Sequence, residues 1–385
     1  MSKRALIVHA LFDILGGAEF LALNTARALM EAGFEVHILT ATPIVPGRIS
    51  GIFANNVLPN IIIRRVKRVE FLSKIKPGRL ARFRRILVVN SYWGLLEEAR
   101  KEYDLVIDTQ SNLPTPVDMV YIHFPALIAY PKHELKGLLW KVYNWVVKVS
   151  ARKYKIPRSS RILTNSTWTA HMIYEVHGVI ADVVYPPVDI EYFNVVAGND
   201  RREKLVVIIS RFTPEKGLEK ILDVARRLPD YTFTLVGSTG PGSDKVLEAL
   251  KARRNELGLS NIEFKPDFPR SELRELLGRA MFYLHPEFPE HFGISIVEAM
   301  SAGVVPIVYR DGGGWYDIVS RVSESLGYNS IVDVPKIIRA LEENKELYIR
   351  LREKSIEVSK LFNYESFKKN LLEKTEYIMR IKKLT

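Results

Sequence analysis

The chain has 385 residues, enough for two or three domains at about 150 residues each, and it is 47% hydrophobic and 26% charged, as ordinary folded proteins are. It contains no cysteine, which excludes disulfides, thiolate zinc sites and a cysteine nucleophile. No stretch of about 18 apolar residues occurs, so we expect no membrane-spanning helix. The net charge of +12 favours polyanionic partners: nucleic acid, anionic lipid or phosphorylated small molecules.

The first half of the chain opens with a strand, a glycine turn, a helix and a second strand. Residues 4–9 predict a buried strand, Gly16 and Gly17 the turn, residues 19–32 the helix and residues 35–40 the next strand. Strands that alternate with helices in this way are typical of a parallel sheet covered by helices.

The second half of the chain repeats this alternation with more regular spacing. Strands are predicted at 204–210, 232–236, 262–264, 281–284 and 304–308, and helices at 244–258, 271–280 and 294–302, with a further helix opened by Thr213 and Pro214. A long helical stretch over 364–383 follows and is able to cover either half. The pattern predicts a second parallel sheet.

Helix- and strand-breaking residues concentrate between 186 and 203, where we place the domain boundary. We therefore predict an α/β fold with two Rossmann-like, doubly wound domains facing a cleft. The domains span residues 1–190 and 191–363, and the helix over 364–385 crosses back to the first. Ligands of such sheets bind beyond the carboxyl ends of the strands, so the loops there are the candidate functional segments.

The most specific of these loops runs from residue 289 to 300. Glu290 follows a predicted strand, and Glu298 lies eight residues on, in the helix that Gly293 precedes. Amides at a helix start hold anions, and glycine lets a ligand approach the backbone. With a carboxylate on each side of these amides, the segment suits a ligand with a diphosphate between two sets of sugar hydroxyls. The amides bind the phosphate, and the carboxylates accept hydrogen bonds from the hydroxyls. Two alternatives stay open: solvent-exposed glutamates in surface ion pairs, and the carboxylate pair of a glycosidase.

A basic cluster follows the first strand of the second domain. Arg211 comes directly after the strand, and Lys216 is predicted in the first turn of the next helix. A guanidinium offers a planar fork to phosphate oxygens and an ammonium a mobile point charge. The pair is suited to neutralise a departing diphosphate, whereas the alternative is an arginine capping the sheet and a solvated lysine.

Three further signals are weak when taken alone. Gly16 and Gly17 permit positive φ and a close backbone approach to phosphate, and Gly237 lies in a similar glycine loop after a strand. His123 ends an apolar strand, where a core histidine is the commoner role. The chain has neither D-x-D nor G-x-x-x-x-G-K-[ST], so we expect no catalytic metal, no cofactor and no P-loop nucleotide hydrolysis.

Two basic, aromatic stretches predict a surface for anionic membranes. Residues 64–85 hold ten basic residues and one acid, and residues 136–155 combine lysines with two tryptophans and two tyrosines. Each Lys or Arg near an anionic bilayer contributes about 1 kcal/mol. A non-catalytic nucleic-acid-binding protein is the alternative, although no helix-turn-helix, zinc finger or RNA-binding signature accompanies these residues.

Together the motifs resemble those of the retaining glycosyltransferases of family 4, which have the GT-B fold. The resemblance is carried by Gly-Gly-Ala-Glu at 16–19, R-x-x-x-E-K-G at 211–217 and E-x7-E at 290–298. Within that family, residues 121–125, 164–169, 184–189 and 290–294 look like the eukaryotic α-1,2-mannosyltransferases that extend the dolichol-linked oligosaccharide. Those enzymes carry an amino-terminal membrane anchor, which this sequence does not show.

The resemblance implies an acceptor-binding first domain and a nucleotide-sugar-binding second domain. Arg211 and Lys216 are expected to bind the donor diphosphate, Glu298 the ribose and Glu290 the transferred sugar. His123 is expected near the reacting centre, as a catalytic residue alongside Glu290, Arg211 and Lys216. The backbone segments expected to meet the donor are Gly16, Gly17, Gly237, Phe292, Gly293 and Ile294.

The resemblance also implies a metal-independent, retaining transfer of a sugar from a nucleotide-sugar to a lipid-linked or membrane-associated glycan. Mannose from GDP-mannose is the specific expectation, and the enzyme is expected on the cytoplasmic face of a membrane, attached peripherally. The alternative within the class is a UDP-sugar-dependent enzyme with a soluble acceptor. No nucleic-acid partner is expected.

Overall fold

The computed structural model describes residues 2–12, 16–42, 44, 94–125, 141–142, 145, 160–240 and 242–384, together with the backbone of 62–65. Its contacts divide the chain into two compact units. The first comprises Met1–Pro187 and Tyr364–Thr385, and the second comprises Val188–Asn363. The carboxyl-terminal helix therefore packs as part of the first unit, although the second unit precedes it in sequence.

The first unit is built on a parallel sheet with the strand order β3-β2-β1-β4-β5-β6-β7. Its strands are β1 (Lys3–Val8), β2 (Phe34–Thr40), β3 (Ile62–Arg65), β4 (Leu105–Asp108), β5 (Met119–Ile122), β6 (Arg161–Thr164) and β7 (Asp182–Val183). Its helices are α1 (Gly17–Glu31), a helix over 94–102, α6 (Thr167–His177) and α14 (Tyr364–Leu384).

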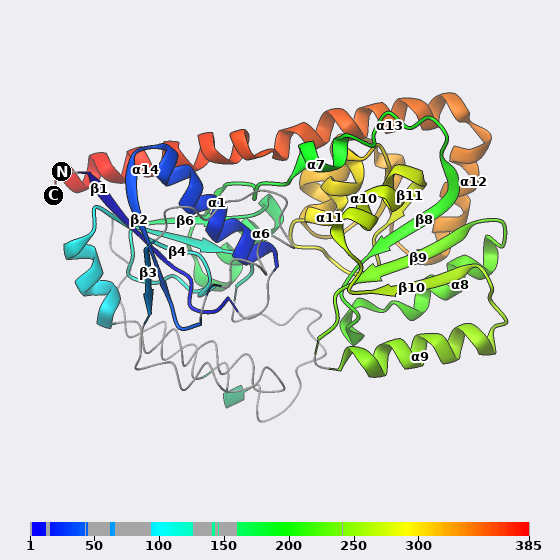
Figure 1. Cartoon of the computed structure of the whole chain (residues 1–385), viewed down its shortest axis with the longest axis horizontal. Coiled ribbons are helices and arrows are strands. Elements are labelled where there is room, and N and C mark those ends of the chain that lie inside the picture. Colours follow the sequence, from blue (N-terminus) through cyan, green and yellow to red (C-terminus); the bar gives the residue numbers. More distant parts are fainter. Residues whose placement is uncertain are drawn as a thin grey trace. The chain divides into compact units, whose positions relative to one another are not determined.

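Apolar side chains cover both faces of this sheet, because successive residues of a strand point to opposite faces. Ala5 and Ile7 of β1 pack with α1 and with Phe367 and Leu371 of α14, whereas Leu6 and Val8 pack with the helix over 94–102. Figure 1 shows α1 and α14 covering the first of these faces. Both faces being buried explains why β1 is a continuous apolar run rather than an alternating one.

The second unit has a parallel sheet with the order β10-β9-β8-β11-β12-β13. Its strands are β8 (Glu203–Ile209), β9 (Thr232–Gly237), β10 (Ile262–Pro266), β11 (Ala280–Leu284), β12 (Val305–Tyr309) and β13 (Gly327–Tyr328). Its α-helices are α7 (Ile190–Asn194), α8 (Glu219–Arg227), α9 (Ser243–Glu256), α10 (Arg270–Arg279), α11 (Ile294–Ser301), α12 (Val334–Glu343) and α13 (Lys345–Ser359), and Figure 1 labels them.

Both sheets have the doubly wound order in which the chain reverses direction across the sheet at its first strand. The reversal lies between β1 and β4 in the first unit and between β8 and β11 in the second. Loops at the carboxyl ends of the two strands at such a switch point diverge to opposite sides and leave a crevice where ligands bind. The fold therefore directs attention to the segments after β1 and β4, and after β8 and β11.

The predicted strands and helices of the second half agree with the structure to within one or two residues, with one exception. Thr213 and Pro214 open only a single 3₁₀ turn, Pro214–Lys216, and α8 begins at Glu219. Gly217 ends the turn in the left-handed conformation, with φ 57°, which interrupts the helix. The expectation that Lys216 lies in the first turn of the α-helix is therefore wrong.

Candidate functional site

The switch point of the second sheet brings a lysine and a glutamate into contact. Lys216 follows β8 and Glu290 follows β11, and Lys216 Nζ donates a hydrogen bond of 3.0 Å to Glu290 Oε2. The lysine side chain is only 10% exposed, and its ammonium lies 4.1 Å from the centroid of the Phe288 ring. Two of the residues that the sequence singles out are thus paired at the place where the fold favours a ligand.

Two histidines lie beside Glu290 and contribute to the electrostatics of this pair. One ring nitrogen of His285 lies 2.9 Å from a backbone carbonyl oxygen, and its Nε2 lies 3.3 Å from Glu290 Oε2. Burial alone would raise the pKa of Glu290, but Lys216 and His285 hold it well below its usual value. Burial lowers the pKa of His291 to about 4, and the positive charge of Lys216 acts in the same direction. Glu290 is therefore ionised and His291 neutral at neutral pH.

Arg211 lies near this pair but takes no part in it. Its side chain is exposed just beyond β8, and its positive charge contributes to the low pKa of His291. Within the described residues, no carboxylate pairs with its guanidinium. The structure thus places one paired and one unpaired cation after the same strand.

A glycine segment after β12 supports the loop that carries Glu290. Gly312 adopts φ 89°, and a Cβ on it would lie 2.3 Å from the carbonyl oxygen of Glu290. Gly314 donates its amide hydrogen to that carbonyl at 3.3 Å. Only glycine permits this close approach of the two backbones, so the glycine segment holds the loop of Glu290 in place. Sequence reasoning missed this segment, although three consecutive glycines after a predicted strand were a readable signal.

Helix α11 begins where the sequence predicts, directly after Gly293. This glycine is the N-cap with φ 114°, and a Cβ would lie 2.6 Å from Ile296 Cδ1. Phe292 is buried and packs edge-on against Phe362, which anchors the loop in the core. Ile294, the first residue of α11, directly follows the loop that carries Glu290. The amides of the first turn of α11 therefore come directly after that loop in the chain.

Glu298 is buried inside α11 and paired with an arginine that the sequence did not single out. Arg270, the first residue of α10, donates from Nη1 to Glu298 Oε1 at 2.9 Å. Burial raises the pKa of Glu298, and the nearby positive charge of Arg270 only partly offsets this. The surface ion pair considered as an alternative is excluded for Glu298, since its side chain is only 8% exposed.

Gly237, the last residue of β9, has a structural reason to be glycine. A Cβ there would lie 1.8 Å from the carbonyl oxygen of Ser210, which follows the neighbouring strand. Gly237 also accepts a hydrogen bond from the amide of Asp267 at 2.8 Å. The close approach of two backbones accounts for this glycine, and its expected contact with the donor remains a prediction.

In the first unit, His123 follows β5 and is held by hydrogen bonds. Its amide donates to Asn112 Oδ1 at 2.8 Å, and its ring Nε2 donates to the carbonyl oxygen of Thr109 at 3.0 Å. The carbonyl oxygen of His123 accepts from Asn165 Nδ2 at 2.9 Å. The ring is half-buried with a fixed orientation at the carboxyl edge of the sheet, and a role in catalysis remains a prediction.

The glycine turn after β1 has a carboxylate of its own at the helix start. Glu19 Oε2 accepts the amide hydrogen of Gly16 at 2.9 Å, and Glu19 Oε1 lies 3.4 Å from Nε2 of the buried His9. Gly16 has φ −154°, and Gly17 is not among the residues with positive φ. Neither glycine therefore uses the conformation that the sequence allowed it, and sequence reasoning missed the His9–Glu19 pair.

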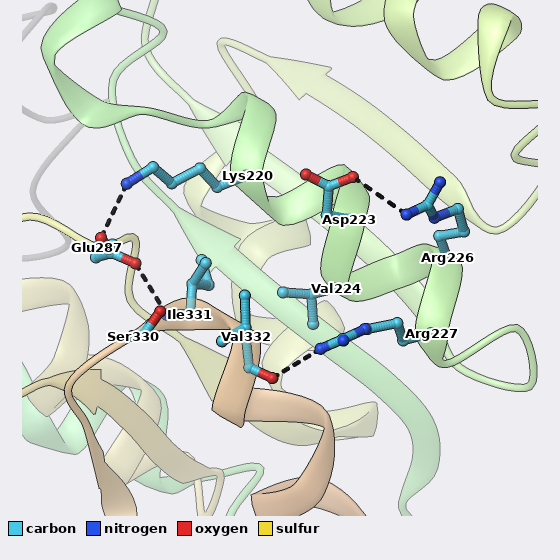
Figure 2. Close-up of a pocket in the computed structure, with 9 residues that line it drawn as sticks. All are labelled: Lys220, Asp223, Val224, Arg226, Arg227, Glu287, Ser330, Ile331 and Val332. Atoms are coloured by element: carbon cyan, nitrogen blue, oxygen red, sulfur yellow. Dashed lines mark hydrogen bonds and ion pairs between the residues drawn. The ribbon is translucent and has the colours of Figure 1, made fainter.

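A second lysine–glutamate pair lines a pocket of about 430 Å³ beside α8, shown in Figure 2. Lys220 donates to Glu287 Oε1 at 2.8 Å, and Glu287 Oε2 accepts the amide hydrogen of Ile331 at 2.8 Å. This pair comes from the same two segments as Lys216 and Glu290, but the Lys220 side chain is 46% exposed. The chain therefore supplies a matched pair in which the lysine is more exposed and the glutamate similarly exposed.

The two predicted membrane-binding stretches fall almost wholly outside the described residues. Of the second stretch, Lys141, Val142 and Trp145 are described, and the Trp145 side chain is 65% exposed. In the part of the chain that the structure covers, every helix is too short or too polar to traverse a bilayer.

The family comparisons agree with the two-unit architecture. Residues 15–192 match the family model described as Glycosyltransferase Family 4, and residues 190–358 match the model described as Glycosyl transferases group 1. The two models adjoin where the first unit ends and the second begins. Together the two models span residues 15–358, so the chain belongs to the glycosyltransferases that these models describe.

The chain is similar over part of its length to curated mannosyltransferases. The chain is 24% identical over 290 residues to the GDP-Man:Man(3)GlcNAc(2)-PP-Dol alpha-1,2-mannosyltransferase of Dictyostelium discoideum, covering 66% of this chain and 57% of that protein. It is 33% identical over 197 residues to the enzyme of the same name from Xenopus tropicalis, covering 48% and 38%. The chain thus spans between about two fifths and three fifths of the length of these curated relatives.

The fold is shared with solved structures at low sequence identity. Anabaena HepE, crystallised with UDP and glucose, superposes with a TM-score of 0.70 at 18% identity, covering 98% of this chain and 100% of that one. The similarity confirms the predicted GT-B architecture of two Rossmann-like domains.

Proposed function

We propose that the chain transfers mannose from GDP-mannose to a lipid-linked glycan, with retention of anomeric configuration and without a catalytic metal. The observation that carries this proposal is the Lys216–Glu290 pair, with its buried lysine, at the switch point of the second sheet. The names of the Dictyostelium and Xenopus relatives support the donor and the acceptor class.

The two cations after β8 supply positive charge that stabilises a leaving diphosphate. Lys216 holds a buried positive charge, and Arg211 offers an exposed guanidinium to a second phosphate oxygen. Charges that are already in place where negative charge develops lower the barrier, because they need no reorganisation during the reaction. Lys216, held in place by Glu290, and the exposed Arg211 together take the role that a divalent metal has in other transferases.

The carboxylates are arranged to orient the sugar and the nucleoside. Within the described residues, both hydrogen bonds to the Glu290 carboxylate fall on Oε2, so Oε1 is left to accept sugar hydroxyls. Among the same residues, the one side-chain bond to the Glu298 carboxylate falls on Oε1, which leaves Oε2 for ribose hydroxyls. His291, neutral at pH 7, contributes no charge to the site.

In the transfer step, the bond between the anomeric carbon and the phosphate oxygen breaks, and a bond from that carbon to the acceptor oxygen forms. The acceptor hydroxyl proton passes to the departing phosphate oxygen, which lies on the same face of the sugar. This route preserves configuration and needs only that the leaving group be stabilised, which Lys216 and Arg211 supply.

We also propose that the enzyme works at the cytoplasmic face of a membrane, to which it binds peripherally. Residues 64–85 and 136–155 supply the basic charge, and the exposed Trp145 is suited to the lipid–water interface. A lipid-linked acceptor is presented at that interface, so binding there concentrates the enzyme on its substrate.

The test is transfer by the purified full chain in EDTA, with a detergent-solubilised lipid-linked trimannosyl acceptor and either GDP-mannose or UDP-glucose as donor. Released nucleotide and extended glycolipid are measured together. We expect GDP release with acceptor-dependent product, and a loss of about 100-fold or more for Lys216→Met and Glu290→Gln. Lys220→Met and Glu287→Gln are the matched controls and should retain activity.

Several outcomes would overturn the proposal. Activity that disappears in EDTA and returns with a divalent cation contradicts the metal-free mechanism. Turnover of UDP-glucose alone contradicts the donor. Equal losses in the Lys216→Met and Lys220→Met variants show that the Lys216–Glu290 pair has no special role.

A further inference from the structure

Arg270 lies at the centre of a group of acidic and aromatic side chains in the second unit. Its Nη1 donates to Glu298 Oε1 at 2.9 Å, and its Nη2 lies 3.7 Å from Asp189 Oδ2. Its guanidinium carbon lies 5.3 Å from the centroid of the Tyr192 ring and 4.8 Å from that of Phe193. One guanidinium thus bridges two carboxylates from different segments and is held by the aromatic rings of α7.

The two carboxylates depend on this guanidinium for their charge. Asp189 and Glu298 have side chains only 6% and 8% exposed, and burial raises the pKa of both. The charge of Asp189 raises the pKa of Glu298 further, and the charge of Glu191 on α7 does the same for Asp189. The Tyr283 hydroxyl on β11 also interacts with Glu298; it bonds to Ser295 and carries no positive charge. Without Arg270, two buried like charges would face each other, and one of them would take up a proton.

A protonated Glu298 is a poorer partner for ribose. A carboxylate accepts hydrogen bonds at both oxygens, whereas a carboxylic acid must donate from one of them. Arg270 occupies Oε1, so the oxygen that remains for a ligand is the other one. The arginine therefore determines both the charge of Glu298 and which of its oxygens is open.

We propose that Arg270 is a positioning residue of the donor site, which holds Glu298 as an anion with one oxygen reserved for the nucleotide's ribose hydroxyls. This inference rests on the proposed function, because it takes Glu298 to bind the donor nucleoside. Arg270 thus sets the affinity for the nucleotide although it lies outside the family-like motifs. The negative charge of Asp189 acts against this effect of Arg270.

The experiment measures GDP affinity by isothermal titration calorimetry between pH 6 and pH 9, on the full chain and its variants. Arg270→Met should bind about tenfold more weakly at pH 6 to 7 and approach the wild type at pH 9, where Glu298 loses its proton. Adding Asp189→Asn should rescue binding at low pH, because it removes the opposing charge. Arg270→Lys keeps the charge without the fork, so it should weaken binding with little pH dependence.

Arg274→Met is the matched control. Arg274 lies one turn further along α10 and contacts the same Tyr192 ring at 4.8 Å, but it pairs with the exposed Glu275. It should bind GDP as the wild type does. Thermal melting of each variant shows whether a loss of binding reflects unfolding. Arg270→Gln, which also removes the positive charge, replaces Arg270→Met if the latter does not fold.

The outcomes separate this inference from the function on which it rests. Tight GDP binding by the wild type with an unchanged pH profile in Arg270→Met overturns the role of Arg270 and leaves the donor intact. A uniform loss that Asp189→Asn fails to rescue also overturns it, since a merely structural role would behave so. A wild type that binds neither GDP nor UDP overturns both.

Discussion

The Lys216–Glu290 pair gives the sharpest quantitative test of the site. The perturbation is a double-mutant cycle of Lys216→Met, Glu290→Gln and the combination of both. Each single change leaves one charged partner without its counterpart, whereas the double variant leaves neither charge. The coupling free energy of unfolding is then the stability that the pair contributes beyond its separate side chains.

The magnitude follows from the geometry. Two unit charges 3.0 Å apart attract each other by about 5.5 kcal/mol at an effective dielectric constant of about 20. Desolvation offsets most of this for a lysine that is 10% exposed. The Glu290 side chain is 29% exposed and keeps His285 as a partner, so we expect a net coupling of about 2 kcal/mol.

The assay is urea unfolding followed by far-UV circular dichroism, at pH 7 and constant salt, with slopes compared among the four proteins. The same cycle on Lys220 and Glu287 is the control, because that lysine is 46% exposed and exposed pairs contribute about 0.5 kcal/mol. A coupling for Lys216 and Glu290 no larger than the control would refute the reasoning that burial makes this pair strong.

Two further predictions concern pH and membranes. The pKa of His291 falls from 6.5 to about 4 on folding, so its contribution to stability is complete above pH 6.5 and is lost as the pH drops toward 4, by up to about 3 kcal/mol. His291→Gln should flatten the decline in urea midpoints between pH 6.5 and 4.5, and an unchanged slope would contradict this. The wild type should float with vesicles containing anionic lipid, whereas a variant with the basic residues of 64–85 neutralised should not, and equal flotation would disprove a role for that stretch.

The sequence was sufficient for the architecture because both sheets are parallel and buried. Residues 205–208, Leu-Val-Val-Ile, are all buried in β8, and such a run has few alternatives to a central strand. The start of α11 was readable from Gly293, since glycine before an apolar helical run marks an N-cap. The 3₁₀ turn at 214–216 could not be predicted from the sequence. Its end depends on the left-handed conformation of Gly217, which the sequence permits but does not require.

The candidate site was predictable in its carboxylates and cations but not in its supporting residues. Glu290, Glu298, Lys216 and Arg211 lie at spacings that point to a ligand. Arg270 reaches Glu298 from 28 residues away along the chain, and no local pattern encodes a contact between two helices. The supporting contacts follow from strand order, which only the folded chain reveals.

Each unit places a histidine beside a glutamate at the carboxyl edge of its sheet, after β1 in the first unit and after β11 in the second, yet only one of these two carboxylates is arranged to meet a ligand. In the first unit, Glu19 has both oxygens engaged, one near His9 and the other on the amide of Gly16, and its side chain is 11% exposed. In the second, Glu290 has both bonds on one oxygen and a side chain 29% exposed. Because a carboxylate with both oxygens occupied must give up a protein bond to bind anything else, Glu19 is arranged to cap a helix, and Glu290 to accept a hydroxyl.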